Sequence, residues 1–312
     1  MSDHSAADEY RAVVVTGING FVGQHVAADL HRHGFAVIGV GRDDAVDPAI
    51  KPIVKQYISA DLAQGWPTLP EVDAVIHLAG LAAVGASFDD PQQYIAVNSS
   101  IITHLCEHYL ESTHRPRILG MSSGAIYASA GKHALAESSP IHISSPYVVS
   151  KLLIENQLSY YSNRGLDCVT ARPFNHVGPG QGSGFLIADL VNQVSDAMKR
   201  GTSVSVGDLT TARDYTDVRD VAAAYRLLAT APKLAHSLYN VASGHATSGE
   251  KILRMVRDAL GADTLEVTVD TARLRPNDNM FVVGDARRLN RDLGWSSAIP
   301  LKQTIADVAA RM

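Results

Sequence analysis

A tyrosine and a lysine stand four residues apart in the segment YVVSK at 147–151. Residues four apart lie on one face of a helix, so the phenol of Tyr147 and the amine of Lys151 are expected to be neighbours. A phenol with its ordinary pKa of about 10 is a poor acid–base catalyst at neutral pH, and an adjacent ammonium lowers that pKa. Ser123 ends an apolar run and is placed to hydrogen-bond the same substrate oxygen. The sequence therefore predicts proton transfer, with Ser123, Tyr147 and Lys151 as catalytic residues.

A cluster of glycines near the start of the chain joins an apolar strand pattern to a helical pattern. Gly17 permits a tight turn, Gly20 lets the backbone approach a pyrophosphate, and Gly23 permits close packing of helix on sheet. The first turn of such a helix offers N–H groups and a partial positive charge to phosphates. This junction predicts a dinucleotide site, and the residues assigned to it are Gly17, Asn19, Gly20, Phe21, Val22 and Gly23.

The end of the second predicted strand discriminates between the two nicotinamide dinucleotides. An NAD site usually carries an acidic residue here for the ribose hydroxyls, whereas a 2′-phosphate prefers an arginine. The chain has Gly41 followed by Arg42, which favours NADP(H) over NAD(H). In the alternative interpretation, Arg42 is a solvated loop residue and Asp43 binds the ribose.

Two further strand ends complete the predicted cofactor site. Asp61 and Leu62 close the third strand, where Asp61 either reaches the adenine edge or caps a helix. The fourth strand ends in a segment whose small residues let the dinucleotide lie against the backbone, and this segment is Leu78, Ala79 and Gly80.

Short apolar runs alternate with longer helical patterns through the first half of the chain. Strands are predicted over 11–17, 36–41, 56–61, 73–79, 117–122 and 167–174, and helices over 21–33, 92–113 and 146–163. The near-continuous Val, Ile and Leu character of the strands suits coverage on both faces. The alternation predicts an α/β fold, a Rossmann-like doubly wound parallel sheet with a smaller C-terminal substrate-binding lobe.

The pattern is less regular after Pro173. Helices are predicted near 185–200, 218–230, 248–260 and 301–312, with strands at 203–207 and 237–243 and a loop before residue 218. Asp217 and Asp220 precede a helical run and are interpreted as helix caps.

Composition limits the classes of protein that remain. With Lys+Arg 27 against Asp+Glu 32 and a net charge of -5, the chain lacks the basic excess of a nucleic-acid-binding protein. The 46% hydrophobic content of its 312 residues supports a large core, in which Cys106 and Cys168 are expected. The histidines show no metal-ligand pattern, so no metal is expected. Neither a signal peptide nor a run of about 18 apolar residues is found, which predicts a cytoplasmic protein without membrane contact.

The motifs resemble those of the extended short-chain dehydrogenase/reductases that modify nucleotide sugars. The similarity rests on TGINGFVG at 16–23, HLAG at 77–80, MSSGAIYA at 121–128, YVVSK at 147–151 and RPFN at 172–175. The later motifs look most like GDP-4-keto-6-deoxy-D-mannose reductases, relatives of GDP-mannose 4,6-dehydratase and UDP-galactose 4-epimerase; they are RPFNHVGPGQ at 172–181, RDYTDVRDVAAAY at 213–225 and RPND at 275–278.

This resemblance implies roles for individual residues. Ser123, Tyr147 and Lys151 match the catalytic triad; Tyr147 and Lys151 also belong to the cofactor site, where Lys151 binds the nicotinamide ribose. Asn98, which braces the active-site network, and Pro173 are added to the cofactor site. The residues matched to substrate binding are Ser87, Ser123, Asn175, Arg213, Arg275 and Asp278.

The resemblance also implies an organisation. Residues 1–175 plus 214–245 would form the dinucleotide-binding domain, and 176–213 plus 246–312 the nucleotide-sugar-binding domain. A homodimer is expected through a four-helix bundle built from 92–113 and 146–163, the partners being a nucleotide-diphosphate sugar and a second copy of the chain.

Three reactions share this scaffold. The 4,6-dehydratases use a Glu two residues after the triad Ser, where this chain has Ala125. The loop GLAAVGAS at 80–87 resembles the corresponding loop of the 4-epimerases, but it has Ala82 where that family has a Lys. The 4-epimerases also retain NAD, whereas Arg42 favours NADP. The favoured function is reduction of the C4 keto group of an NDP-4-keto-6-deoxyhexose to a GDP-rhamnose type product. The alternatives are a UDP-glucose/UDP-galactose 4-epimerase, then a 4,6-dehydratase, and more remotely a non-catalytic NAD(P)-binding protein.

Overall fold

The structure is a computed structural model that describes residues 11–270 and 281–311. The chain divides into two compact units. The first unit comprises 11–122, 143–171 and 225–237, and the second comprises 123–142, 172–224 and the described residues from 238 onward. The division of function between a dinucleotide-binding and a sugar-binding domain stays a prediction.

Six parallel strands form the sheet of the first unit. They are β1 (Ala12–Thr16), β2 (Ala36–Gly41), β3 (Val54–Ser59), β4 (Ala74–His77), β5 (Arg117–Met121) and β6 (Cys168–Pro173), the end of β6 passing into the second unit. Their order across the sheet is β6-β5-β4-β1-β2-β3. The direction of winding reverses between β1 and β4, and ligands of such sheets bind at the carboxyl ends of the strands beside this reversal. The predicted doubly wound α/β fold is confirmed.

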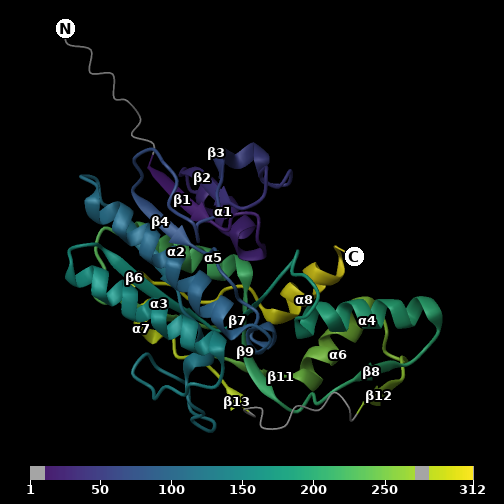
Figure 1. Cartoon of the computed structure of the whole chain (residues 1–312). Coiled ribbons are helices and arrows are strands. Elements are labelled where there is room, and N and C mark those ends of the chain that lie inside the picture. The colour runs from purple at the N-terminus through teal and green to yellow at the C-terminus, as the bar shows by residue number, and fades with distance from the viewer. Residues whose placement is uncertain (1–10, 271–280, 312) are drawn as a thin grey trace. The chain divides into compact units, whose positions relative to one another are not determined.

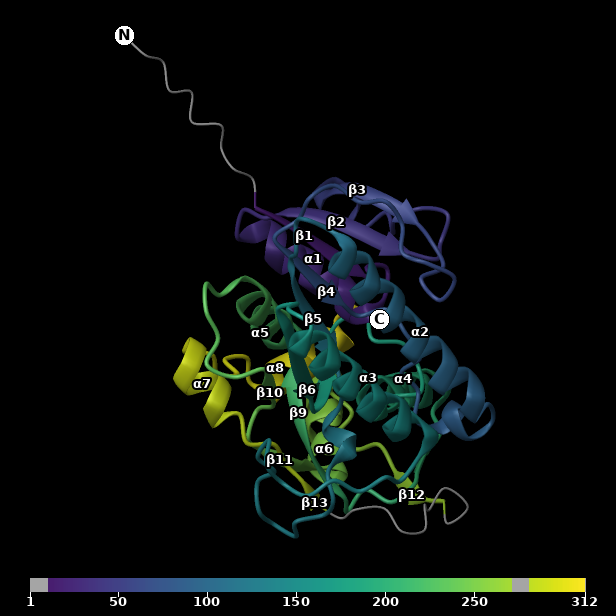
Figure 2. The same ribbon diagram turned by 60° about the vertical axis from the view of Figure 1, so that its left-hand side comes forward.

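The helices of the first unit begin at strong start signals. They are α1 (Phe21–Arg32), α2 (Pro91–Glu111) and α3 (Pro146–Asn163), with short 3-10 helices η1 (Lys51–Ile53) and η2 (Gly85–Phe88). Asp90 and Ser145 cap α2 and α3, and in each a proline occupies the first helical position, which suits its fixed φ. α2 and α3 lie side by side (Figure 1), and α1 packs on β1 and β2 (Figure 2).

The core of the first unit is formed by the central strands with α2 and α3. Val14, Val75 and Ile118 of the sheet pack with Leu105 and Leu158 of the helices. Both cysteines are buried here, as predicted. The expectation that every strand is covered on both faces is wrong for β3, which lies at the edge of the sheet beside β2 and whose residues are all half-buried or exposed.

The second unit contains three helices packed together and a small mixed sheet. Its elements are η3 (Gly124–Ile126), β7 (Asn175–Val177), α4 (Leu186–Arg200), β8 (Val204–Val206), β9 (Ala212–Asp217), α5 (Val218–Thr230, whose end belongs to the first unit), β10 (Leu238–Val241), β11 (Ala246–Ser248), α6 (Gly249–Leu260), β12 (Val267–Val269), β13 (Phe281–Val282), α7 (Arg287–Leu293) and α8 (Leu301–Ala309). β9 lies between β11, which is antiparallel to it, and β7 and β13, which are parallel. α4, α6 and α8 enclose a second apolar core around Val191, Ile252 and Ile305.

The predicted helices and strands after Pro173 are all present, but the sequence pattern did not predict the short strands β7, β9, β11, β12 and β13 or the helix α7. A loop was the expectation before residue 218, but residues 212–217 form a strand. The strand forms because its backbone pairs with β7, β11 and β13, and the buried carboxylate of Asp214 adds hydrogen bonds from the N–H groups of Ser243, Gly244 and Gly284. These donors are distant in sequence, so no local pattern reports them.

The two aspartates interpreted as caps have different roles. Asp217 accepts the N–H of Arg219 at the start of α5, as a cap does, and also binds the hydroxyl of Thr304. The cap interpretation is wrong for Asp220, which lies inside α5 and accepts the N–H groups of Ala298 and Ile299 at 2.9 Å each. Asp220 therefore fixes the segment before α8.

Candidate active site

The turn between β1 and α1 allows a ligand to approach the backbone closely. Gly17 has a φ of 65°, and a Cβ on Gly23 would lie 2.4 Å from the carbonyl oxygen of Gly17. Only glycine therefore lets α1 begin against this turn. α1 starts at Gly20 without a side-chain cap, and its first turn carries no acidic residue. The positive end of α1 fits the pyrophosphate of a dinucleotide.

The other predicted cofactor residues lie at the carboxyl ends of the strands or just after them. Phe21 and Val22 form the first turn of α1 and are half-buried. Arg42 is exposed after Gly41, at which a Cβ would lie 2.9 Å from the hydroxyl of Tyr57. Asp61 is exposed and its carboxylate accepts the N–H of Ala63, so it stabilises the turn after β3, while Leu62 is buried.

A threonine and a histidine connect the glycine turn to the end of β4. The hydroxyl of Thr16 accepts the N–H groups of Leu78 and Ala79, both at 3.1 Å, and lies 2.8 Å from Nδ1 of His77. Because the oxygen already accepts two hydrogen bonds, its own hydrogen is donated to His77. Burial, with the positive charge of Lys151, lowers the pKa of His77 to about 3, so this histidine is neutral. Sequence reasoning missed both side chains, although HLAG at 77–80 was among the motifs.

Tyr147 and Lys151 lie in the first two turns of α3, as the spacing predicts. Their side chains are 8% and 9% exposed. The amine of Lys151 donates to the carbonyl oxygen of Met121 at 3.0 Å and lies 5.7 Å from the centre of the Tyr147 ring. Burial lowers the pKa of Lys151 to about 8, which leaves it cationic at neutral pH. The arrangement places a positive charge beside a phenol.

Asn98 of α2 braces this part of α3. Its amide nitrogen donates to the carbonyl oxygen of Leu81 and to the hydroxyl of Ser150, and its oxygen accepts the N–H of Leu81. Ser150 directly precedes Lys151, so Asn98 ties the segment after β4 to the turn of α3 that carries the amine. Gly80, with a φ of 143°, is required beside it, because a Cβ there would lie 2.7 Å from the Asn98 oxygen.

Ser87 and Ala82 lie in the segment between β4 and α2. Ser87 is fully buried in η2, and its hydroxyl donates to the carbonyl oxygen of Val84 at 2.6 Å. The hydroxyl is enclosed, and a substrate contact for Ser87 stays a prediction. Ala82 is exposed, at the position where the epimerases would carry a lysine.

Ser123 lies two residues after the end of β5 and is the first residue of the second unit in this part of the chain. Ser123 caps η3, its hydroxyl oxygen accepting the N–H of Ala125 at 3.1 Å. Ala125 is exposed and carries no group that can transfer a proton. This agrees with the sequence argument against a dehydratase.

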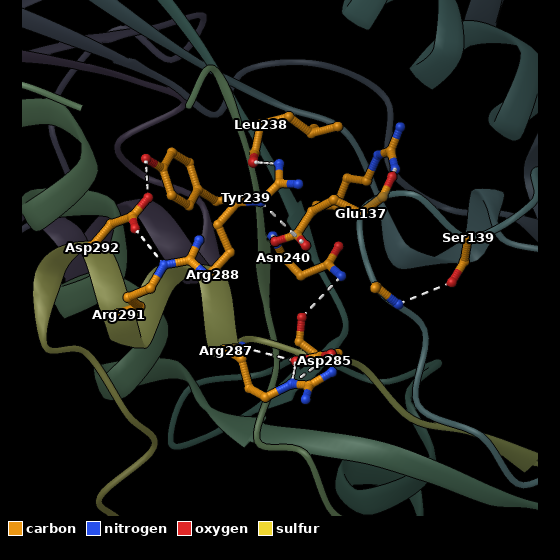
Figure 3. Close-up of polar contacts among 12 residues, drawn as sticks. Glu137, Ser139, Leu238, Tyr239, Asn240, Asp285, Arg287, Arg288, Arg291 and Asp292 are labelled. Atoms are coloured by element: carbon orange, nitrogen blue, oxygen red, sulfur yellow. Dashed lines mark hydrogen bonds and ion pairs between the residues drawn. The ribbon is translucent and has the colours of Figure 1, made fainter. Parts of the chain in front are cut away.

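A buried polar cluster holds the segment that follows Ser123. The guanidinium of Arg172 donates to the hydroxyl of Tyr127, which in turn donates to the amide oxygen of Asn240 at 2.6 Å. Burial raises the pKa of Tyr127, so it remains a donor. Figure 3 shows Asn240 between Glu137, which accepts its backbone N–H, and Asp285, whose carbonyl oxygen accepts its side-chain amide. Sequence reasoning missed this cluster, whose members come from distant motifs.

The predicted substrate residues of the second unit are only partly described. Asn175 of β7 is exposed and pairs with Tyr215 of β9, two residues after Arg213. Paired and alternate residues of strands share a face, so Asn175 and Arg213 point to the same side of this sheet. Pro173 is half-buried at the end of β6. Arg275 and Asp278 lie outside the described residues.

Within residues 11–270 and 281–311, His, Cys, Asp and Glu side chains nowhere gather in threes as a metal site would require. In the same part of the chain, every helix is too short or too polar to cross a membrane.

Comparison with known proteins identifies the family. The model of the NAD dependent epimerase/dehydratase family matches residues 13–242. GDP-6-deoxy-D-mannose reductase from Pseudomonas aeruginosa is 35% identical over 302 residues, which cover 93% of each chain. UDP-glucose 4-epimerase from Mycolicibacterium smegmatis is 29% identical over 313 residues, 94% of this chain and 96% of that protein.

A solved structure gives the same result. The structure of RMD from Pseudomonas aeruginosa complexed with NADPH has a TM-score of 0.77 to this chain at 30% identity, covering 96% of this chain and 98% of the other. The resemblance inferred from the motifs is confirmed, and with it the expectation of an NAD(P)-dependent enzyme. The chain belongs to the NAD dependent epimerase/dehydratase family, within the extended short-chain dehydrogenase/reductases.

Proposed function

We propose that this protein reduces the C4 keto group of an NDP-4-keto-6-deoxyhexose with NADPH as reductant. The observation that carries the proposal is the buried cation of Lys151 beside the phenol of Tyr147, one helical turn away. Ala125 argues against a dehydratase, because the side chain of alanine cannot remove a proton from the sugar. Similarity to a GDP-6-deoxy-D-mannose reductase, at 35% identity, favours reduction and a GDP-linked substrate.

The residues of this chain would act on the oxygen of the keto group. NADPH, when bound at the glycine turn, supplies the hydride that the carbon of this group accepts. Tyr147 donates its phenolic proton to the oxygen as negative charge develops there. Lys151 stabilises the phenolate that Tyr147 becomes, and Ser123 donates a hydrogen bond to the same oxygen. Asn98 keeps the first two turns of α3 in place through Ser150.

A stoichiometric experiment tests the reaction. Purified protein is incubated with GDP-, UDP- or dTDP-linked 4-keto-6-deoxyhexose and NADPH, and the absorbance of the reduced nicotinamide is followed. We expect one NADPH consumed for each keto sugar converted to a deoxyhexose. Conversion without consumption of NADPH contradicts a reductase.

The preference for NADP(H) rests on Arg42. Its guanidinium is exposed directly after the buried Gly41, and a planar guanidinium can hold a 2′-phosphate by two hydrogen bonds. We expect Arg42→Ala to weaken NADPH binding by about tenfold or more, since a charge-assisted bond contributes roughly 1.5–3 kcal/mol. NADH binding should change little, and equal losses for both dinucleotides would contradict this role.

A second candidate is a nucleotide-sugar 4-epimerase. It is favoured by the 29% identity to UDP-glucose 4-epimerase from M. smegmatis over nearly the whole of both chains. This function predicts that the purified protein carries tightly held NAD and interconverts UDP-glucose and UDP-galactose without added dinucleotide. The absorbance experiment distinguishes the two functions directly.

We also propose that the chain forms a homodimer through α2 and α3. These helices lie side by side in the first unit (Figure 1), and α3 exposes the apolar surface of Val149 and Tyr160 away from the buried residues Ile154 and Leu158. Two such pairs of helices from two copies would make a four-helix bundle.

A further inference from the structure

Asn19 lies in the turn between β1 and α1, and both polar atoms of its side chain form hydrogen bonds with the loop that follows β2. Its amide nitrogen donates to the carboxylate of Asp43 at 2.7 Å and to the carbonyl oxygen of Ala45 at 2.9 Å. Its oxygen accepts the N–H of Asp47 at 2.9 Å. The glycine turn and the loop after β2 are therefore joined by a single side chain.

Other hydrogen bonds hold the same loop, but their acceptors are atoms other than the Asp43 carboxylate oxygens. Gln24 of α1 donates to the Asp47 carboxylate at 3.2 Å and to the carbonyl oxygen of Asn19 at 3.0 Å. The hydroxyl of Tyr57 donates to the backbone carbonyl of Asp43 at 2.8 Å. The direction of the Asp43 carboxylate is therefore governed by Asn19, whereas the path of the backbone has several supports.

Asp43 is the negative charge nearest in sequence to Arg42. Both side chains are exposed, and Arg42 directly follows the strand end at which the ribose of a dinucleotide would lie. A hydrogen bond from an amide does not neutralise a carboxylate, but it determines where the charge lies. A free Asp43 could pair with Arg42 or approach a 2′-phosphate, and both changes weaken binding of that phosphate.

We propose that Asn19 is a specificity-determining positioning residue, which favours NADPH over NADH by holding the carboxylate of Asp43 away from Arg42. The inference rests on the proposed dinucleotide site and goes beyond it by assigning the discrimination to a residue of the glycine turn. NADH lacks the 2′-phosphate, so its affinity should depend little on where this carboxylate lies.

Binding of NADPH and of NADH to the full chain, each titrated by calorimetry without sugar substrate, tests the proposal. We expect Asn19→Ala to lower the ratio of NADPH to NADH affinity by about tenfold, the effect of a misplaced charge at short range. The double variant Asn19→Ala with Asp43→Ala should restore the ratio, because the charge that Asn19 controls is then absent. A purely structural role of Asn19 would not be rescued in this way.

Gln24→Ala is the matched control, since it removes hydrogen bonds to the same loop without touching Asp43. Its affinity ratio should equal that of the unmodified protein. Equal weakening of both dinucleotides by Asn19→Ala, failure of Asp43→Ala to rescue, or the same selective loss in Gln24→Ala would overturn the proposal. Turnover with keto sugars is measured separately, so a failure of the proposed reaction leaves these binding outcomes interpretable.

Discussion

Tyr147 carries the proton in the proposed reaction, and its hydroxyl is the group whose removal is most informative. Tyr147→Phe keeps the ring and the packing of α3 but has no proton to donate. We expect turnover to fall by about 100-fold or more, the usual contribution of general acid catalysis. The affinity for NADPH should stay within about twofold. A variant that retains most of its activity in the absorbance assay would contradict the assignment.

The proposed role of Lys151 predicts that the reaction is sensitive to pH on the alkaline side. Its pKa is lowered to about 8 from 10.5 by burial, so the amine loses its charge as the pH rises through about 8. We expect the rate of reduction to fall over this range, because Tyr147 then loses the cation that stabilises its phenolate.

The stability of the fold should move in the opposite direction. Between about pH 8 and 10.5 the unfolded chain binds the Lys151 proton and the native chain does not, so this group adds stability as the pH rises. The rate and the midpoint of thermal unfolding, measured on the same samples, separate the two effects. A rate that is constant from pH 7 to about 9.5 would argue against a cationic Lys151 in the reaction.

At the scale of elements, the junction of β1 and α1 depends on the absence of one side chain. A Cβ on Gly23 would lie 2.4 Å from the Gly17 carbonyl oxygen and 2.6 Å from that of Ile18, both of them backbone atoms that cannot rotate away. We expect Gly23→Ala to destabilise the protein by about 1–3 kcal/mol, as overpacking does, and to weaken NADPH binding by displacing the start of α1.

Gly65→Ala is the control for this substitution. A Cβ on Gly65 meets no atom within 4 Å, so its unfolding midpoint and NADPH affinity should be unchanged. If Gly23→Ala behaves like Gly65→Ala in urea unfolding and in titration, close packing of α1 against the glycine turn is not what the dinucleotide site requires.

The elements themselves are largely predictable from local sequence. α3 has a serine cap, a proline at its first position and apolar residues at helical spacing, and all of these act within a few residues. β9 has no such signal, because ARDYTD at 212–217 contains three charged residues. Its formation depends on pairing with β7, β11 and β13, and the donors that hold Asp214 lie about 30 and 70 residues further along the chain.

At the scale of the whole molecule, the proposed homodimer can be tested by measuring the molecular mass in solution. Light scattering should report twice the 33.3 kDa mass of the chain. Tyr160→Asp on α3 should produce monomers, because it places a charge in the apolar interface. Phe185→Asp is the control, since Phe185 is equally exposed at 55% but lies in the second unit. A monomer before substitution, or dissociation by Phe185→Asp alone, would contradict the proposed interface.

The candidate site, like the fold, has features that local sequence predicts and features that depend on partners far apart in the chain. The glycine turn, the Tyr147–Lys151 spacing and Ala125 are local features, so the expectation of an NAD(P) cofactor and the argument against dehydration both follow from the sequence. The neutral state of His77 depends on its burial and on Lys151, 74 residues away, and the direction of Asp43 depends on Asn19, 24 residues away. Such partners meet only when the strands assemble.

The sequence by itself determined the family and the doubly wound sheet, and it supplied the candidates for proton exchange, because these follow from short-range periodicity and from motifs at strand ends. The tertiary structure alone decided which polar groups are buried together: Asn98 with Ser150, Arg172 with Tyr127 and Asn240, and Asp214 with its backbone donors. The physical reason is that a buried hydrogen-bonding group must be satisfied, but any compatible partner in the chain can satisfy it. Which partner does so is determined by the packing of elements that are far apart in sequence.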